Sequence, residues 1–176
     1  MNMNILIAYY SRRGQNYVGG TIEDLRIGNT EVVAQKIERQ TGGDMFRIDT
    51  VKPYPADYTA CTEVARRELH ENARPRLADR VDDMQQYDLV FLGYPNWWGT
   101  MPMVVHAFLE SYDFTGKTII PFCTHEGSGM GRSVADIRRL CPATAVLDGA
   151  AIRGGNAARA DEEVRKLVEQ AKKQKR

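Results

Sequence analysis

Residues 93–102 read GYPNWWGTMP, and the rest of the chain is organised around this stretch. It follows Leu89–Leu92, a short apolar run that is typical of a strand buried on both faces. Glycines and prolines flank the only two tryptophans of the chain, which places both on a loop. Large rings on a surface loop need either a core to enter or a flat molecule to cover. A tryptophan that merely closes the edge of a sheet would explain the same pattern, so the neighbouring loops must decide.

Apolar runs of strand length alternate with helix-like segments along the whole chain. Besides 89–92, strands are expected at 4–10, 45–49, 118–124 and 145–147, and residues 150–152 either prolong or neighbour the last of these. Helices are expected at about 29–40, at 58–72, after Pro102, around 134–140 and from Asp161 onward. This alternation predicts an α/β fold with five parallel strands, right-handed crossovers and helices on both faces.

Length and composition narrow the class of protein. The 176 residues suit one domain, 1–176, and the net charge of +1 argues against a surface built for nucleic acid. No apolar run reaches the roughly 18 residues of a membrane span, and the N-terminus lacks a secretory signal pattern. Cys61, Cys123 and Cys141 are isolated, as in reduced thiols. We expect a cytoplasmic protein with neither a membrane nor a nucleic-acid partner.

The loop after the first strand is polar and contains glycine. An inserted segment at about 17–28, which could form a small hairpin, delays the helix until Asn29 or Thr30, either of which can cap it. Hydroxyls, amides and free N–H groups at a helix N-terminus form an anion site, and a phosphomonoester is the natural ligand. Neither GxxxxGK[ST] nor GxGxxG occurs. An ordinary capped helix after a polar loop explains these residues equally well. The candidates are Ser11, Arg12, Gly14, Asn16, Asn29 and Thr30.

The loop after the fourth strand, residues 124–129, reads THEGSG, and glycines 127, 129 and 131 would let backbone approach a ligand closely. All three loops leave the carboxyl ends of strands, the edge where open α/β sheets bind ligands. A phosphate site at one end and flat rings at the other indicate a mononucleotide, most plausibly FMN. The candidates from these two loops are Pro95, Asn96, Trp97, Trp98, Gly99, Thr124, His125, Glu126, Gly127, Ser128 and Gly129.

In these segments the chain resembles the flavodoxin family, and the resemblance covers nearly the whole chain in the right order. It rests on Ser11 with residues 28–30, on 93–100 and on 124–129. It implies a flavodoxin-like three-layer sandwich with strand order 2-1-3-4-5 and FMN at the carboxyl edge. It also implies that Ser11, Asn16, Asn29 and Thr30 surround the phosphate, while 95–99 and 124–129 flank the ribityl chain and isoalloxazine. The insertion departs from the family pattern and would give Arg12 and Gly14 a share of the phosphate site.

Two functions follow from the resemblance. The first is electron transfer through bound FMN with a redox partner protein. The alternative is an NAD(P)H-dependent flavin oxidoreductase that reduces quinones or similar small acceptors, toward which the nearly neutral charge and the insertion lean. No catalytic residue and no metal site is assigned: His125 could contact flavin or substrate, or simply be polar. The sequence leaves open whether the protein forms a homodimer.

Overall fold

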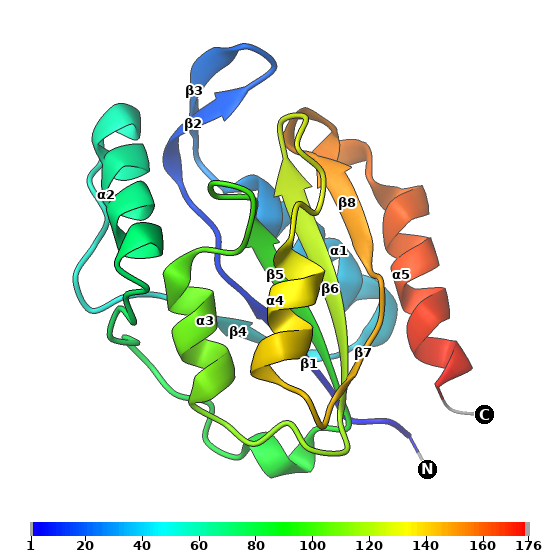
Figure 1. Cartoon of the computed structure of the whole chain (residues 1–176). Helices are drawn as coiled ribbons and strands as arrows, with labels where there is room; N and C mark the ends of the chain where they lie inside the picture. The colour runs from blue at the N-terminus through cyan, green and yellow to red at the C-terminus, as the bar shows by residue number, and fades with distance from the viewer. Residues whose placement is uncertain (1, 175–176) are drawn as a thin grey trace.

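The computed structural model describes residues 2–174, and in it a parallel sheet lies between two layers of helices (Figure 1). Met1, Lys175 and Arg176 lie outside the described residues. The order in the sheet is β4-β1-β5-β6, and β7 and β8 both pair with β6. The strands are β1 Ile5–Tyr9, β4 Asp44–Arg47, β5 Leu89–Pro95, β6 Thr118–His125, β7 Ala145–Val146 and β8 Ala150–Arg153. The predicted α/β fold and strand order are confirmed, with β7 and β8 together in the place of the fifth strand.

The fifth strand is split because of one residue in its neighbour. Pro121 of β6 has no N–H to donate to a ladder. β7 pairs with β6 before this proline and β8 pairs after it. Between them the chain turns at Gly149, whose φ of +67° suits glycine and where a Cβ would come within 1.8 Å of the Pro121 carbonyl oxygen. The break is therefore fixed by Pro121 of the neighbouring strand together with Gly149 at the turn.

Alternate residues of the central strands point to opposite faces, which explains their uninterrupted apolar runs. On one face Ile7 and Phe91 pack with α1 and α5, and on the other Leu6 and Val90 pack with α3 and α4. The helices are α1 Asn29–Thr41, α2 Tyr58–His70, α3 Met103–Glu110, α4 Ser133–Leu140 and α5 Asp161–Lys173, with short 3₁₀ turns at η1 Met84–Gln86 and η2 Gly154–Arg159. Within residues 2–174 no helix combines the length and apolar character needed to cross a membrane.

The inserted segment is a two-stranded antiparallel hairpin, β2 Gly14–Val18 and β3 Thr21–Leu25. It begins at Gly14 rather than at Tyr17, so Gly14 and Asn16 lie in a strand. The hairpin stands clear of the main sheet, next to α2 (Figure 1). This isolated pair of strands is held by side chains of the loops around it, described below.

The expected cap of α1 was wrong. Gly28 is the N-cap, and the side chain that binds the first turn comes from Ser11, whose Oγ accepts the Glu31 N–H at 3.0 Å. A Cβ at Gly28 would lie 2.2 Å from that Oγ, so only glycine lets the two segments meet. Ser11 is 2% exposed and fills the space behind the helix end.

The buried His106 of α3 gives the fold a testable dependence on pH. Its Nδ1–H points to the Pro102 carbonyl oxygen at 3.3 Å, and its side chain is enclosed. Burial lowers the pKa of His106 below its usual 6.5. The unfolded chain therefore binds the proton more readily, and the free energy of unfolding should fall as pH drops below 6.5. We expect the variant His106→Gln to show a shallower pH dependence than the wild-type chain in urea unfolding at pH 7.5 and 5.5. Equal slopes would contradict this.

Candidate functional site

A cavity of about 380 Å³, the first cavity, opens at the carboxyl edge of the sheet, where the three loops meet. Its volume falls within the range of small-molecule sites. The lining comes from the hairpin, the start of α1, the start of α2 and the loops after β5, β6 and β8. Its residues are Arg12, Asn16, Tyr17, Asn29, Thr30, Tyr58, Pro95, Asn96, Trp97, Thr124, His125, Glu126, Gly127, Ser128 and Gly154.

One end of the first cavity is the N-terminus of α1. Within residues 2–174 no group accepts the N–H of Asn29 or of Thr30. The Thr30 and Thr124 hydroxyls are 2.7 Å apart, so one donates to the other and the acceptor keeps a proton to offer elsewhere. Free N–H groups, a hydroxyl and the helix dipole favour an anion at this end.

The loop after β5 is fastened to the loop after β6 by Asn96. Its N–H donates to the Thr124 carbonyl at 2.8 Å, and its side-chain amide donates to the Gly129 carbonyl at 2.8 Å. Its Oδ1 accepts the Gly99 N–H at 2.9 Å. The same side chain therefore shapes its own loop and fixes that loop to the next one.

The two tryptophans have different surroundings. Trp97 is half-buried and meets the rings of Tyr10 and Tyr54 edge to face, at centroid distances of 5.2 and 5.1 Å. Trp98 is 49% exposed, adopts a left-handed φ of +57° and donates its Nε1–H to the Thr62 carbonyl of α2 at 3.0 Å. Trp97 thus presents a ring fixed by packing to the first cavity, while Trp98 leans toward α2.

The loop after β6 places His125 and Glu126 at the cavity. The Nδ1 of His125 accepts the Gly127 N–H at 2.9 Å, so the neutral ring carries its proton on Nε2. Burial, with Arg153 close by, lowers the pKa of His125. The Oε2 of Glu126 accepts the Gly19 N–H at the hairpin tip at 3.0 Å. Its Oε1 is buried without a hydrogen-bond partner in the described residues.

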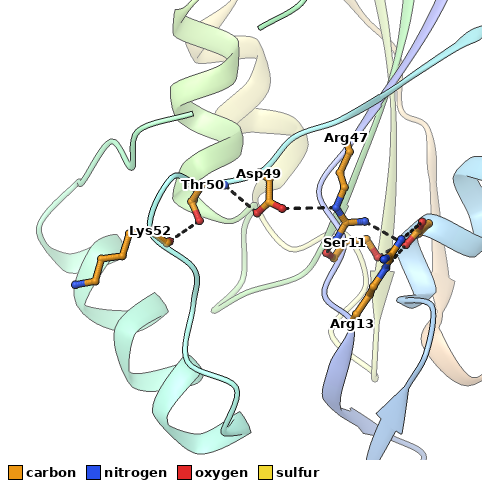
Figure 2. A network of polar contacts seen from close by, with 7 residues as sticks. Ser11, Arg13, Arg47, Asp49, Thr50 and Lys52 are labelled. Carbon is orange, nitrogen blue, oxygen red and sulfur yellow. Dashed lines mark hydrogen bonds and ion pairs between the residues drawn. The ribbon is translucent and has the colours of Figure 1, made fainter. Parts of the chain in front are cut away.

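The cations of the first loop are largely engaged in structure. Arg12 donates to the carbonyls of Gln15 and Ala56 at 2.9 and 2.8 Å, which braces the hairpin against the start of α2. Arg13 and Arg47 both bind the carboxylate of Glu31, at 2.8 and 3.1 Å, in the network of polar contacts drawn in Figure 2. The anion end of the cavity therefore relies on backbone N–H groups more than on free cations.

Most residues predicted from the sequence meet at the first cavity, while five do not line it: Ser11, Gly14, Trp98, Gly99 and Gly129. Three lining residues were missed, namely Tyr17, Tyr58 and Gly154. Tyr17 lay in the insertion, Tyr58 opens a helix to which no site residue was assigned, and Gly154 follows a strand whose loop was not considered. At Gly154 a Cβ would lie 2.6 Å from both Asn29 Nδ2 and Glu126 Oε1. The two adjacent glycines, 154 and 155, are the sequence signal that could have indicated this close approach.

The hydrogen bond between Glu126 and the Gly19 N–H at the hairpin tip predicts that the hairpin opens more often when this bond is removed. Replacing Glu126 by Ala removes the acceptor of the Gly19 N–H. We expect hydrogen exchange in peptides that cover 14–25 to speed up about tenfold, the equivalent of one lost hydrogen bond. The exposed Glu63 of α2 supplies the control variant Glu63→Ala. An unchanged exchange rate in Glu126→Ala would mean that the hydrogen bond does not hold the hairpin.

A family model described as flavodoxin matches residues 25–171. The chain belongs to the flavodoxin family. The match begins at residue 25 and leaves β1 and most of the hairpin outside it. No curated protein is recognisably similar to the chain in sequence.

Solved structures agree with membership of the flavodoxin family. A flavoprotein from Bacteroides eggerthii is 26% identical over 96% of this chain and 97% of its own, with a TM-score of 0.75. One from Bacteroides uniformis is 24% identical over 96% and 99%, with the same TM-score of 0.75. A flavoprotein in complex with FMN from Lactobacillus acidophilus is 21% identical over 94% and 99%, with a TM-score of 0.66.

Proposed function

We propose that this chain binds FMN in the first cavity and transfers electrons through it. The observation that carries the proposal is the pair of free N–H groups of Asn29 and Thr30 at one end of a cavity whose other end is the fixed ring of Trp97. An anion site at one end and a flat aromatic ring at the other match the phosphate and the ring system of a mononucleotide. Family membership and the FMN complex of the Lactobacillus acidophilus flavoprotein support it.

The part of the first cavity beside Glu126 fits a sugar-alcohol chain. The Oε1 of Glu126 is a buried acceptor without a donor, and a ligand hydroxyl would satisfy it. Gly154 keeps the space beside it open, because a Cβ there would lie 2.6 Å from this oxygen and from Asn29 Nδ2. Bound FMN supplies one- and two-electron chemistry. The chain contributes the binding groups, the orientation of the ring and the exclusion of water from one side.

Two roles are compatible with this site. As an electron carrier the protein would exchange electrons with a redox partner protein. The second candidate is an oxidoreductase that takes electrons from NAD(P)H and passes them to a small acceptor, and one observation favours it. A further cavity adjoins the first and shares the ring of Trp97 with it.

Flavin titrations test the binding proposal. We expect the purified apoprotein to quench FMN fluorescence and to bind riboflavin at least about tenfold more weakly, because riboflavin lacks the anion for the α1 end. Equal affinity for FMN and riboflavin would show that the phosphate does not bind at the α1 end. Failure to bind either flavin would refute the proposal. Anaerobic stopped-flow mixing of the FMN-loaded protein with NADPH or NADH then separates the roles. Rapid bleaching indicates a reductase, and bleaching only through a separate reductase protein indicates a carrier.

A further inference from the structure

A second cavity of about 410 Å³ lies between α2 and the tryptophan loop. It is lined by Arg12, Asn16, Tyr58, Cys61, Thr62, Ala65, Asn96, Trp97 and Trp98. The first cavity by itself already reaches from the start of α1 to Trp97. Five residues line both cavities, and only Cys61, Thr62, Ala65 and Trp98 line the second one alone. A mononucleotide seated in the first cavity therefore leaves the α2 side of the second cavity to another molecule.

The walls of the second cavity are flat and aromatic. Trp97 and Trp98 come from one side, and Tyr58 with the small side chain of Ala65 comes from α2. Trp98 is held in place by its Nε1–H bond to the Thr62 carbonyl, and it keeps a strained φ of +57° to do so. A residue with this backbone conformation persists only where its surroundings hold it. Aromatic rings that line a cavity favour a planar ligand that stacks against them.

The polar groups at the second cavity select for ligand oxygens. Both amide hydrogens of Asn16 and the Thr62 hydroxyl are used inside the protein. Within residues 2–174 no oxygen or nitrogen accepts from the Arg12 Nη1 or pairs with the Tyr58 hydroxyl, although the Arg12 guanidinium also lies close to the Cys61 thiol and both residues line the first cavity as well. These two are donors, and one is cationic. A ligand that uses them brings acceptor oxygens, such as a ring carbonyl or an anionic substituent.

We propose that the second cavity binds a planar aromatic molecule that carries carbonyl or anionic oxygens, stacked beside Trp97 and Trp98 with its oxygens toward Arg12 and Tyr58. This proposal rests on the proposed function in one respect, namely that FMN occupies the first cavity. A ligand here lies next to the cofactor site, on its α2 side. This is the position of a small acceptor rather than of a protein partner.

The probe for the test is anthraquinone-2-sulfonate, which is planar, has two carbonyls and an anion, and does not add to the thiol of Cys61. Because the only two tryptophans line the cavity, quenching of the intrinsic fluorescence of the apoprotein reports binding, and the variants below assign that binding to the second cavity rather than to the first, which Trp97 also lines. We expect saturable quenching in the wild-type chain. Ala65→Phe, which fills the cavity from α2, should weaken binding of the probe at least about tenfold. Glu63→Phe places the same ring on the exposed side of α2 and should leave binding unchanged.

FMN affinity, measured in the same variants by flavin fluorescence, separates the two sites. We expect Ala65→Phe to bind FMN as the wild-type chain does. If Ala65→Phe loses FMN and the probe together, the second cavity holds the cofactor ring and the proposal is overturned. Equal binding of the probe by wild type and Ala65→Phe, or none by wild type, also overturns it. Should Ala65→Phe fail to fold, Thr62→Phe fills the cavity from a half-buried position. A wild-type chain that binds the probe but not FMN would refute only the proposed function.

Discussion

Replacing Trp97 by Ala is expected to weaken FMN binding about tenfold and to lower the free energy of unfolding by about 2–3 kcal/mol. Two losses combine in this variant. The ring that faces the first cavity disappears, and the edge-to-face contacts with Tyr10 and Tyr54 disappear with it. The half-buried position of Trp97 keeps the stability loss below that of a fully enclosed tryptophan. Flavin fluorescence titration and urea unfolding followed by circular dichroism measure the two effects.

Trp98→Ala is the matched control. Trp98 lines the second cavity but not the first, and about half of its surface is exposed. We expect FMN affinity within about twofold of wild type and a stability loss below about 1 kcal/mol. A reversed pattern, with Trp98→Ala weakening FMN and Trp97→Ala leaving it intact, would place the flavin ring on the α2 side. No effect in either variant would show that neither indole contacts the ring.

The second large effect is expected at Glu31. Its side chain is 7% exposed, and its carboxylate accepts hydrogen bonds from Arg13 and Arg47 (Figure 2). In Glu31→Gln the shape is kept and both charge-assisted pairs are lost. Because Arg13 and Arg47 are 57% and 31% exposed, water can solvate them, which reduces the penalty for an orphaned cation. We expect a loss of about 2 kcal/mol in the free energy of unfolding at pH 7.

The same variant has a defined pH window. The hydrogen bond from Arg13 is the main reason that the pKa of Glu31 lies below its usual 4.5. A carboxyl with a lowered pKa stabilises the fold fully above the unfolded value and loses this contribution as pH falls. The difference between wild type and Glu31→Gln should therefore be complete at pH 7 and shrink below pH 4.5. Glu38→Gln, on the exposed side of α1, is the control. Equal urea midpoints for all three proteins at pH 7 would refute the prediction.

The fold was readily predicted because its signals are local. A strand covered on both faces must be apolar at every position, and 4–10, 89–92 and 118–124 all meet that condition. The split of the fifth strand was left open, because it depends on Pro121, which lies far along the sequence from β7 and β8. Ser11 as the side chain that caps α1 could not be predicted for the same reason, since its partner Glu31 follows a whole hairpin.

The candidate site was predictable where the chain brings residues together by topology. The loops at 95–99 and 124–129 follow adjacent parallel strands, so they had to meet. Tyr58 was not predictable in this way, because the start of α2 is brought to the site by contacts with the hairpin, through Gln15 and the stacked ring of Tyr17. The engagement of Arg12 by carbonyls also left no trace in sequence. Composition and periodicity could not predict the contacts that depend on the inserted segment.

The interruption at Pro121 and Gly149 bears on how copies of this protein behave at high concentration. A long open strand at the border of a sheet can recruit a strand from another molecule and start aggregation. Here that border is divided into β7, of two residues, and β8, of four, with a kink between them. The opposite border, β4, also has only four residues. Neither border offers a long flat template, so the proline that breaks the ladder also protects the folded molecule from self-association through its sheet.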